Sequence, residues 1–82
     1  MYYVYVIVSQ KKNLRFYVGM SQNIENRINE HNSGKVTSTK AYTPWKLFFT
    51  ETFPDRKSAR DREKYLKGGS GKEMIKRKWN IQ

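Results

Sequence analysis

The sequence predicts an α+β fold, in which a small three-stranded antiparallel sheet is flanked by helices in the order β-β-α-β-α-α. Three runs rich in valine, isoleucine and aromatic residues predict the strands. The segments between and after them begin with capping residues and place apolar side chains three or four positions apart, as helices do. With 82 residues, 37% of them apolar and 15% aromatic, the chain can build one core. We therefore expect a single domain over residues 1–82.

The first two strands are predicted at residues 2–8 and 15–20. Both are nearly continuous in β-branched and aromatic residues, and the polar stretch 9–13 separates them. This arrangement predicts a β-hairpin. Because the stretch has no Asn-Gly or Asp-Gly pair, the sequence leaves the turn type open.

A helix is predicted to follow, with Ser21 as its N-cap and its end near His31. Ile24 and Ile28 lie four positions apart and form its apolar stripe. Residues 32–34, Asn-Ser-Gly, stop it.

Residues 34–44 predict a surface-exposed, mobile loop, because they are polar and poor in apolar side chains. The third strand is predicted at Trp45–Phe53. Within this strand, Trp45, Leu47 and Phe49 are two positions apart. Because successive side chains of a strand point to opposite faces, these three are expected on one face of the sheet.

Two helices are predicted to complete the chain. Asp55 or Ser58 caps the first, which runs through Lys67, and the glycines at 68–69 end it. Residues 70–73, Ser-Gly-Lys-Glu, fit a capping box for the second. The expected core joins residues of the sheet and the helices: Val4, Val6, Val18, Leu47, Phe49, Ile24, Ile28, Leu66 and Trp79.

The chain is strongly basic, with 17 Lys and Arg against 7 Asp and Glu and a net charge of +10. Such a domain is expected to bind a polyanion, and nucleic acid fits best because phosphate contacts release counterions. Anionic lipid fits less well, since no basic stretch carries a broad apolar face. A merely solvated basic surface is the other alternative. The expected nucleic-acid contacts are Lys40, Arg60, Lys64, Lys67 and Lys72.

The chain has no cysteine, which excludes disulfides and a thiolate zinc site. Its longest apolar stretch, residues 4–8, is far shorter than the roughly 20 residues of a membrane span, and no basic segment precedes it as in a signal peptide. We expect a cytoplasmic protein without membrane contact.

Hydrolysis of a phosphodiester needs a positioned water, a proton acceptor, a cation for the developing charge and usually a metal ion. Glu63 lies on an apolar helix stripe and is a suitable oxygen ligand for Mg²⁺ or Mn²⁺. Arg27 and His31 lie one helical turn apart, on one face. Taken alone, Glu63 is better explained by an ion pair with Lys67, four positions later.

The other candidates have structural explanations of their own. Arg27 is three positions from Glu30, the spacing of a helical ion pair, and His31 suits the C-terminal end of a helix dipole. Tyr5 and Tyr17 lie on the two strands of the hairpin, where tyrosines commonly pack.

The order and spacing of these residues resemble the GIY-YIG nuclease superfamily. The resemblance is closest to its small standalone bacterial members, which resemble the catalytic domain of excision-repair nuclease subunits. It covers nearly the whole chain and rests on these segments: Tyr2-Tyr3-Val4-Tyr5-Val6-Ile7, Phe16-Tyr17-Val18-Gly19-Met20-Ser21, Glu25 to Gly34, Pro44-Trp45-Lys46-Leu47, Glu51, Ala59 and Glu63 to Lys67. Tyr3 stands where the first motif has glycine. Many family members also have an asparagine late in the domain, and the one late asparagine of this chain, Asn80, lies too close to its end to correspond to it.

The resemblance implies a single-metal site for cutting DNA. Tyr5 would help to activate the attacking water, and Tyr17 would hold that water or the phosphate. Arg27 would bind the phosphate, His31 would assist proton transfer with a tyrosine, and Glu63 would hold Mg²⁺ or Mn²⁺. A phenol with a pKa near 10 is a poor base at neutral pH, so the cations Arg27 and His31 would have to assist it.

The leading interpretation is therefore a metal-dependent endonuclease acting on DNA, directed to structure or damage, as in DNA repair. The alternative is a nucleic-acid-binding module with weak or lost catalysis. An adaptor for protein partners fits poorly with the charge of +10. RNA as a substrate, a protein partner and a weak homodimer stay open.

Overall fold

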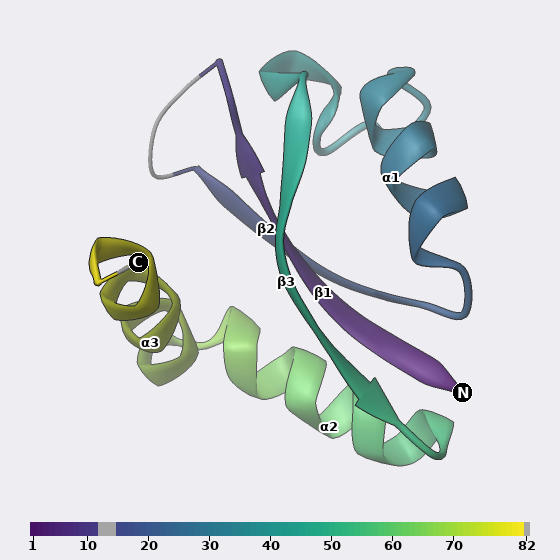
Figure 1. Ribbon diagram of the computed structural model, residues 1–82, viewed down its shortest axis with the longest axis vertical. Helices are drawn as coiled ribbons and strands as arrows, with labels where there is room; N and C mark the ends of the chain where they lie inside the picture. Colours follow the sequence, from purple (N-terminus) through teal and green to yellow (C-terminus); the bar gives the residue numbers. More distant parts are fainter. Residues whose placement is uncertain (12–14, 82) are drawn as a thin grey trace.

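The computed structural model describes residues 1–11 and 15–81 (Figure 1). Lys12, Asn13 and Leu14, within and beside the stretch whose turn type the sequence leaves open, lie outside the described residues, as does Gln82. The order β-β-α-β-α-α is confirmed, with a short 3-10 helix added. The elements are β1 (Tyr2–Ser9), β2 (Phe16–Ser21), α1 (Ile24–Asn32), η1 (Lys40–Tyr42), β3 (Trp45–Phe53), α2 (Arg56–Lys67) and α3 (Gly69–Asn80).

The three described strands form one antiparallel sheet in the order β2-β1-β3. β1 takes the central place because its side chains from Val4 to Val8 are buried on both faces of the sheet. Helices cover both faces, with α1 on one side and α2 and α3 on the other (Figure 1).

The core has two halves, one on each face of the sheet. On the α2–α3 face, valines of β1 and β2 pack against the helices. This half confirms the expected core residues Val4, Val6, Val18 and Leu66 and adds Ala59 and Ile75. The α1 face holds Tyr5, Ile7 and Trp45, with Ile24 and Ile28 partly buried against them. Burial of each large side chain in these clusters stabilises the fold by roughly 1.5–3 kcal/mol.

A bulge in β3 changes the faces that the sequence predicts. Val6 is opposite Phe49 and Ile7 is opposite Leu47, so Phe48 is an extra residue without a partner in β1. Phe48 and Phe49 consequently both pack toward the α2–α3 face. The prediction of Leu47 as a core residue was wrong, because its side chain is 37% exposed.

Two of the predicted helix starts differ from the structure. Asn23, not Ser21, caps α1, and its Oδ1 accepts a hydrogen bond from the Asn26 backbone at 3.1 Å. Ser21 instead bonds with the backbone of Asn23, where it shapes the turn that leads into the helix. Asp55 caps α2, as one of the two predicted alternatives, by accepting from the Ser58 backbone at 2.8 Å.

The predicted capping box of α3 is also wrong, because this helix begins at Gly69 with no side-chain cap. The reason is the close packing of α3 on the end of α2. A Cβ at Gly71 would meet the backbone of Tyr65 and Leu66, at 2.7 Å from the Leu66 carbonyl carbon.

This close contact predicts that Gly71→Ala destabilises the protein. The added methyl group must push α3 away from α2, at a cost of about 1–3 kcal/mol. Gly69→Ala is the matched control, because a Cβ there meets nothing within 4 Å and alanine favours the helix. Urea unfolding measures both. Equal midpoints for the two variants would contradict the proposed packing.

The segment between α1 and β3 is less exposed than predicted. Gly34 has a φ of +80°, which lets the chain turn back after α1. Thr39 is then fully buried, just before η1. The indole Nε1 of Trp45 donates to the Thr39 carbonyl at 2.9 Å and fixes this segment against the sheet.

Within residues 1–11 and 15–81, no helix is long and apolar enough to cross a membrane.

Candidate active site

Tyr5 and Tyr17 come from neighbouring strands and share the α1 face of the sheet. Tyr5 is paired with Gly19 across β1 and β2, and the Tyr5 ring lies over this glycine. Any Cβ at Gly19 would collide with the ring, at 2.8 Å from Cε2. Gly19 therefore makes space inside β2 for the buried tyrosine. The ring centroids of Tyr5 and Tyr17 are 6.5 Å apart.

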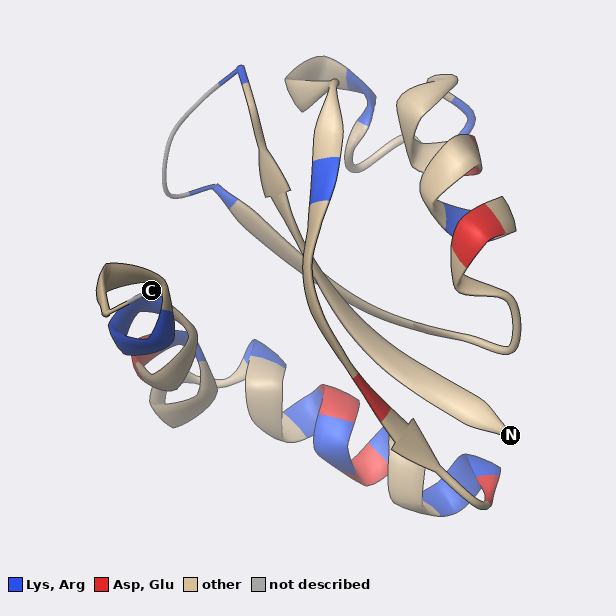
Figure 2. Ribbon diagram, viewed as in Figure 1, with Lys and Arg blue, Asp and Glu red and all other residues tan. Residues whose placement is uncertain are grey.

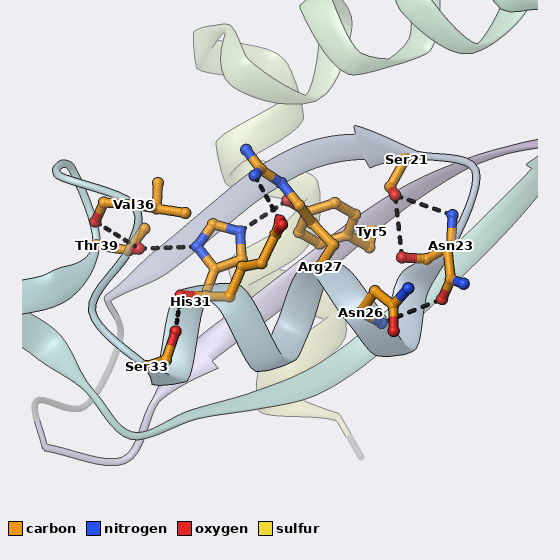
Figure 3. Close-up of polar contacts among 10 residues, drawn as sticks. Tyr5, Ser21, Asn23, Asn26, Arg27, His31, Ser33, Val36 and Thr39 are labelled. Atoms are coloured by element: carbon orange, nitrogen blue, oxygen red, sulfur yellow. Dashed lines mark hydrogen bonds and ion pairs between the residues drawn. The ribbon is translucent and has the colours of Figure 1, made fainter.

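Helix α1 presents Arg27 and His31 to these tyrosines. Figure 3 shows both side chains pointing from the helix toward Tyr5. The Tyr5 hydroxyl and His31 Nε2 are 2.8 Å apart, and the His31 ring lies edge-on to Tyr17 with centroids 5.0 Å apart. The four-residue spacing thus brings both α1 residues to one point above the sheet.

His31 is a buried imidazole. It is fully buried, and burial together with the nearby positive charge of Arg27 lowers its pKa below 6.5. A neutral ring cannot compensate a helix dipole as a cation would. The structure therefore argues against the helix-dipole explanation of this residue.

This burial predicts a pH dependence of stability. Below pH 6.5 the unfolded chain binds a proton on His31 before the folded protein does, so the free energy of unfolding falls as the pH decreases. The slope is at most about 1.4 kcal/mol per pH unit. Because His31 is the one histidine of the chain, His31→Gln should remove this slope between pH 7 and 5 in chemical unfolding. The same slope in both proteins would show that His31 does not titrate as described.

Arg27 forms an ion pair within α1 and points toward Tyr5. Its Nη1 donates to Glu30 Oε1 at 2.9 Å, the i,i+3 ion pair expected as an alternative. Its positive charge also opposes the rise in the pKa of the nearby Tyr5 phenol (Figure 3). The side chain is 36% exposed, so it lies between the buried phenol and solvent. Its ion pair with Glu30 therefore leaves it in contact with the tyrosine cluster.

Tyr5 is held in its neutral form. Burial raises the pKa of its phenol to about 12, while the positive charge of Arg27 acts in the opposite direction. Glu63 of α2 is linked to this cluster through Lys67, which pairs with Glu63 and lies beside the Tyr17 ring. Tyr5, Tyr17, Arg27, His31 and Glu63 therefore converge, although they come from four different elements.

Glu63 is largely buried, with 16% of its side chain exposed, and it pairs with Lys67 at 3.2 Å. Lys67 Nζ also lies 5.8 Å from the centre of the Tyr17 ring. The predicted ion pair is thus present, and it lies beside the tyrosines. In the part of the chain that the structure describes, no three His, Cys, Asp or Glu side chains form a metal site. A single carboxylate suits Mg²⁺, which keeps several water ligands and binds substrate phosphate.

A cleft of about 600 Å³ opens beside β2, between the segment before β3 and the end of α2 with α3. Of the five expected catalytic residues, Tyr17 is the one that the described lining includes. Thr39 and Lys67 also line the cleft. Thr39 is hydrogen-bonded to His31, and Lys67 is paired with Glu63, so both connect the cleft with the other expected catalytic residues. Its cationic lining residues are Arg15, Lys67, Lys72 and Lys76.

The cleft divides the expected nucleic-acid contacts into two groups. Lys67 and Lys72 line it, whereas Lys40, Arg60 and Lys64 are exposed elsewhere. Figure 2 shows Lys and Arg along both α2 and α3. Asn80, at the end of α3, is exposed and is not among the residues lining this cleft.

Sequence reasoning missed Thr39. Its Oγ1 lies 2.7 Å from His31 Nδ1, and both residues are fully buried. His31 lies in α1 and Thr39 lies in the loop after the turn at Gly34, so the periodicity of a single helix or strand does not relate the two. The contact between Thr39 and the buried His31 forms because the chain turns back after α1, and only the three-dimensional structure reveals it.

The small antiparallel sheet with helices on both faces is a nuclease-type fold. The chain belongs to the GIY-YIG family: residues 1–78 match the pattern described as the GIY-YIG catalytic domain. The resemblance predicted from the motifs is thereby confirmed.

Its relatives are small proteins of the same type. A UPF0213 protein of Clostridium perfringens is 37% identical over 68 residues, 82% of this chain and 71% of the relative. Another, of Bacillus licheniformis, is 38% identical over 67 residues, 80% of this chain and 67% of the relative. A third, of Staphylococcus haemolyticus, is 34% identical over 76 residues, which cover 92% of this chain and 90% of that protein.

Proposed function

We propose that the protein is a metal-dependent endonuclease that hydrolyses DNA phosphodiesters. One observation carries the proposal: Tyr17 lies where a basic cleft meets the cluster of Tyr5, Arg27, His31 and Glu63. The cleft supplies cations for a phosphate backbone, and the cluster supplies the groups that hydrolysis requires.

Each residue then has a role that follows from its position. Tyr17, the half-buried phenol in the cleft, holds the attacking water or the scissile phosphate. Arg27 stabilises charge on the non-bridging oxygens, since it is cationic, partly exposed and directed toward Tyr5. Tyr5 and His31 exchange a proton across their 2.8 Å hydrogen bond and so help to activate the water.

Glu63 is the residue suited to hold a divalent ion, Mg²⁺ or Mn²⁺. Its carboxylate is an oxygen ligand, largely enclosed and close to Tyr17 through Lys67. When bound, such an ion lowers the pKa of a coordinated water and stabilises the leaving oxygen. Lys67 neutralises the same carboxylate in the metal-free protein.

We infer that recognition is directed to shape or damage, as in DNA repair or processing. A chain of 82 residues has little surface for base-specific contacts beside this site. Tight sequence-selective cleavage by the isolated protein would contradict this inference. The alternative, a binding module with lost catalysis, is favoured by the full burial of Tyr5, which leaves its hydroxyl without contact to solvent.

Cleavage assays separate the two functions. Labelled branched, flapped and plain duplexes and an RNA duplex are incubated with the protein and Mg²⁺ or Mn²⁺, or with a chelator. We expect cutting of DNA that the chelator stops and added metal restores. Salt-sensitive binding without cutting under any metal condition would replace the proposal with the binding module.

The cleft also predicts which cations bind DNA. Lys72→Ala with Lys76→Ala should reduce the slope of log affinity against log salt by about 2, one unit for each lost phosphate contact. Arg60→Ala with Lys64→Ala removes the same charge outside the cleft and should change the slope less. Fluorescence anisotropy at several salt concentrations measures both. An equal loss in the two variants would show that the basic surface acts without regard to the cleft.

A further inference from the structure

His31 is hydrogen-bonded at both ring nitrogens. Nε2 lies 2.8 Å from the Tyr5 hydroxyl, and Nδ1 lies 2.7 Å from Thr39 Oγ1. All three side chains are fully buried. Thr39 Oγ1 is also 3.3 Å from the Val36 carbonyl (Figure 3). The side chains thus form a chain of hydrogen bonds that begins at Tyr5 and ends on the backbone.

The direction of these hydrogen bonds follows from the chemistry of the groups. The Thr39 hydroxyl has one hydrogen, which it donates to the Val36 carbonyl at 3.3 Å, so its oxygen accepts from His31 Nδ1. The ring hydrogen is therefore on Nδ1. Nε2 of the neutral ring then carries no hydrogen and accepts from the Tyr5 hydroxyl.

The Thr39 hydroxyl thus links the histidine ring to the backbone, because it accepts from His31 Nδ1 and donates to the Val36 carbonyl. The position of Thr39 is itself held, because Trp45 Nε1 donates to its carbonyl and its backbone amide donates to Val36.

We propose that Thr39 is a positioning residue that holds His31 in the tautomer protonated on Nδ1, so that Nε2 accepts the proton of Tyr5. This inference rests on the proposed nuclease function for its consequence. During activation of the water the Tyr5 O–H bond breaks and an Nε2–H bond forms, which gives a phenolate and an imidazolium. Thr39 then accepts a hydrogen bond from a charged ring, which strengthens it.

The tautomer can be measured directly, because His31 is the one histidine of the chain and its ¹⁵N resonances need no assignment. Long-range ¹H–¹⁵N spectra of the neutral ring should show a protonated Nδ1 and an unprotonated Nε2 in the wild type. Thr39→Ser keeps the hydroxyl and should keep this spectrum. Thr39→Val keeps the shape but removes the acceptor, and should shift the ring toward protonation on Nε2. A wild-type ring protonated on Nε2, or an unchanged spectrum in Thr39→Val, overturns the proposal.

Activity provides the second readout. Thr39→Val should lower kcat about 10- to 100-fold at little change in KM, the range in which orienting partners of an imidazole act, and Thr39→Ser should restore it. Thr37→Val is the matched control, because Thr37 lies two positions earlier on the same segment and is exposed. Equal kcat values for Thr39→Val and the wild type overturn the role in catalysis. The NMR result decides the tautomer even if the wild type cuts no DNA, so failure of the proposed function is distinguishable from failure of this inference.

Discussion

Tyr5→Phe should lower kcat for DNA cleavage by roughly 10²- to 10⁴-fold, the contribution expected of a positioned proton-transfer group. The substitution removes a hydroxyl that hydrogen-bonds to His31 at 2.8 Å. It leaves the ring that fills the space above Gly19. The same change leaves Nε2 of the buried His31 without a partner, which costs about 1–3 kcal/mol of stability. Single-turnover kinetics and urea unfolding measure the two effects.

Tyr3→Phe is the control for this prediction. Tyr3 lies two positions away on β1 and is only partly buried, and no hydrogen bond involving its hydroxyl is described. We expect nearly wild-type kcat from it. If Tyr5→Phe loses stability but keeps kcat, Tyr5 serves packing, as the alternative interpretation of a strand tyrosine holds.

Arg27→Ala should lower kcat by about 10²- to 10³-fold, because it removes the cation that faces the developing charge on the phosphate. Arg27→Lys keeps a positive charge but loses the planar pair of donors, and should recover only part of the rate. Single-turnover cleavage at saturating metal and DNA measures both variants.

Glu30→Gln tests the competing explanation of Arg27. It breaks the ion pair of 2.9 Å but leaves the guanidinium in place. We expect stability to change by less than about 1 kcal/mol, as for exposed pairs, and kcat to change little. If Glu30→Gln lowers kcat as much as Arg27→Ala does, catalysis requires the ion pair and not the positive charge of Arg27 alone.

The fold follows from the sequence wherever local patterns are strong. The buried run of β1 and the capped, periodic helices α1 and α2 lie close to where the sequence places them. The errors occur where tertiary packing decides. Phe48 forms a bulge in β3, which the alternation of apolar and polar residues does not predict. Helix α3 begins earlier than predicted, because Gly71 has no Cβ and the end of α2 can pack closely against it. Ser21 and Asn23 are both good caps, and the path of the turn selects between them.

The site is predictable to a similar degree. The spacing of Arg27 and His31 places both on one face of α1, and the structure brings them to Tyr5. Periodicity does not reveal Thr39, since its contact depends on the turn after Gly34. Nor does periodicity show that Lys67, expected as an ion-pair partner and a nucleic-acid contact, lies beside the Tyr17 ring.

Cleavage of the DNA panel by wild type beside Glu63→Gln, with Mg²⁺ or Mn²⁺, tests the central claim most directly. This substitution keeps the shape of the side chain but removes the charge that holds a cation. We expect the wild type to cut and Glu63→Gln to bind with unchanged salt dependence but not to cut. Cutting by both proteins at the same rate would contradict the assignment of Glu63. Salt-sensitive binding by both, with no cutting by either, would show a binding protein that retains the nuclease fold.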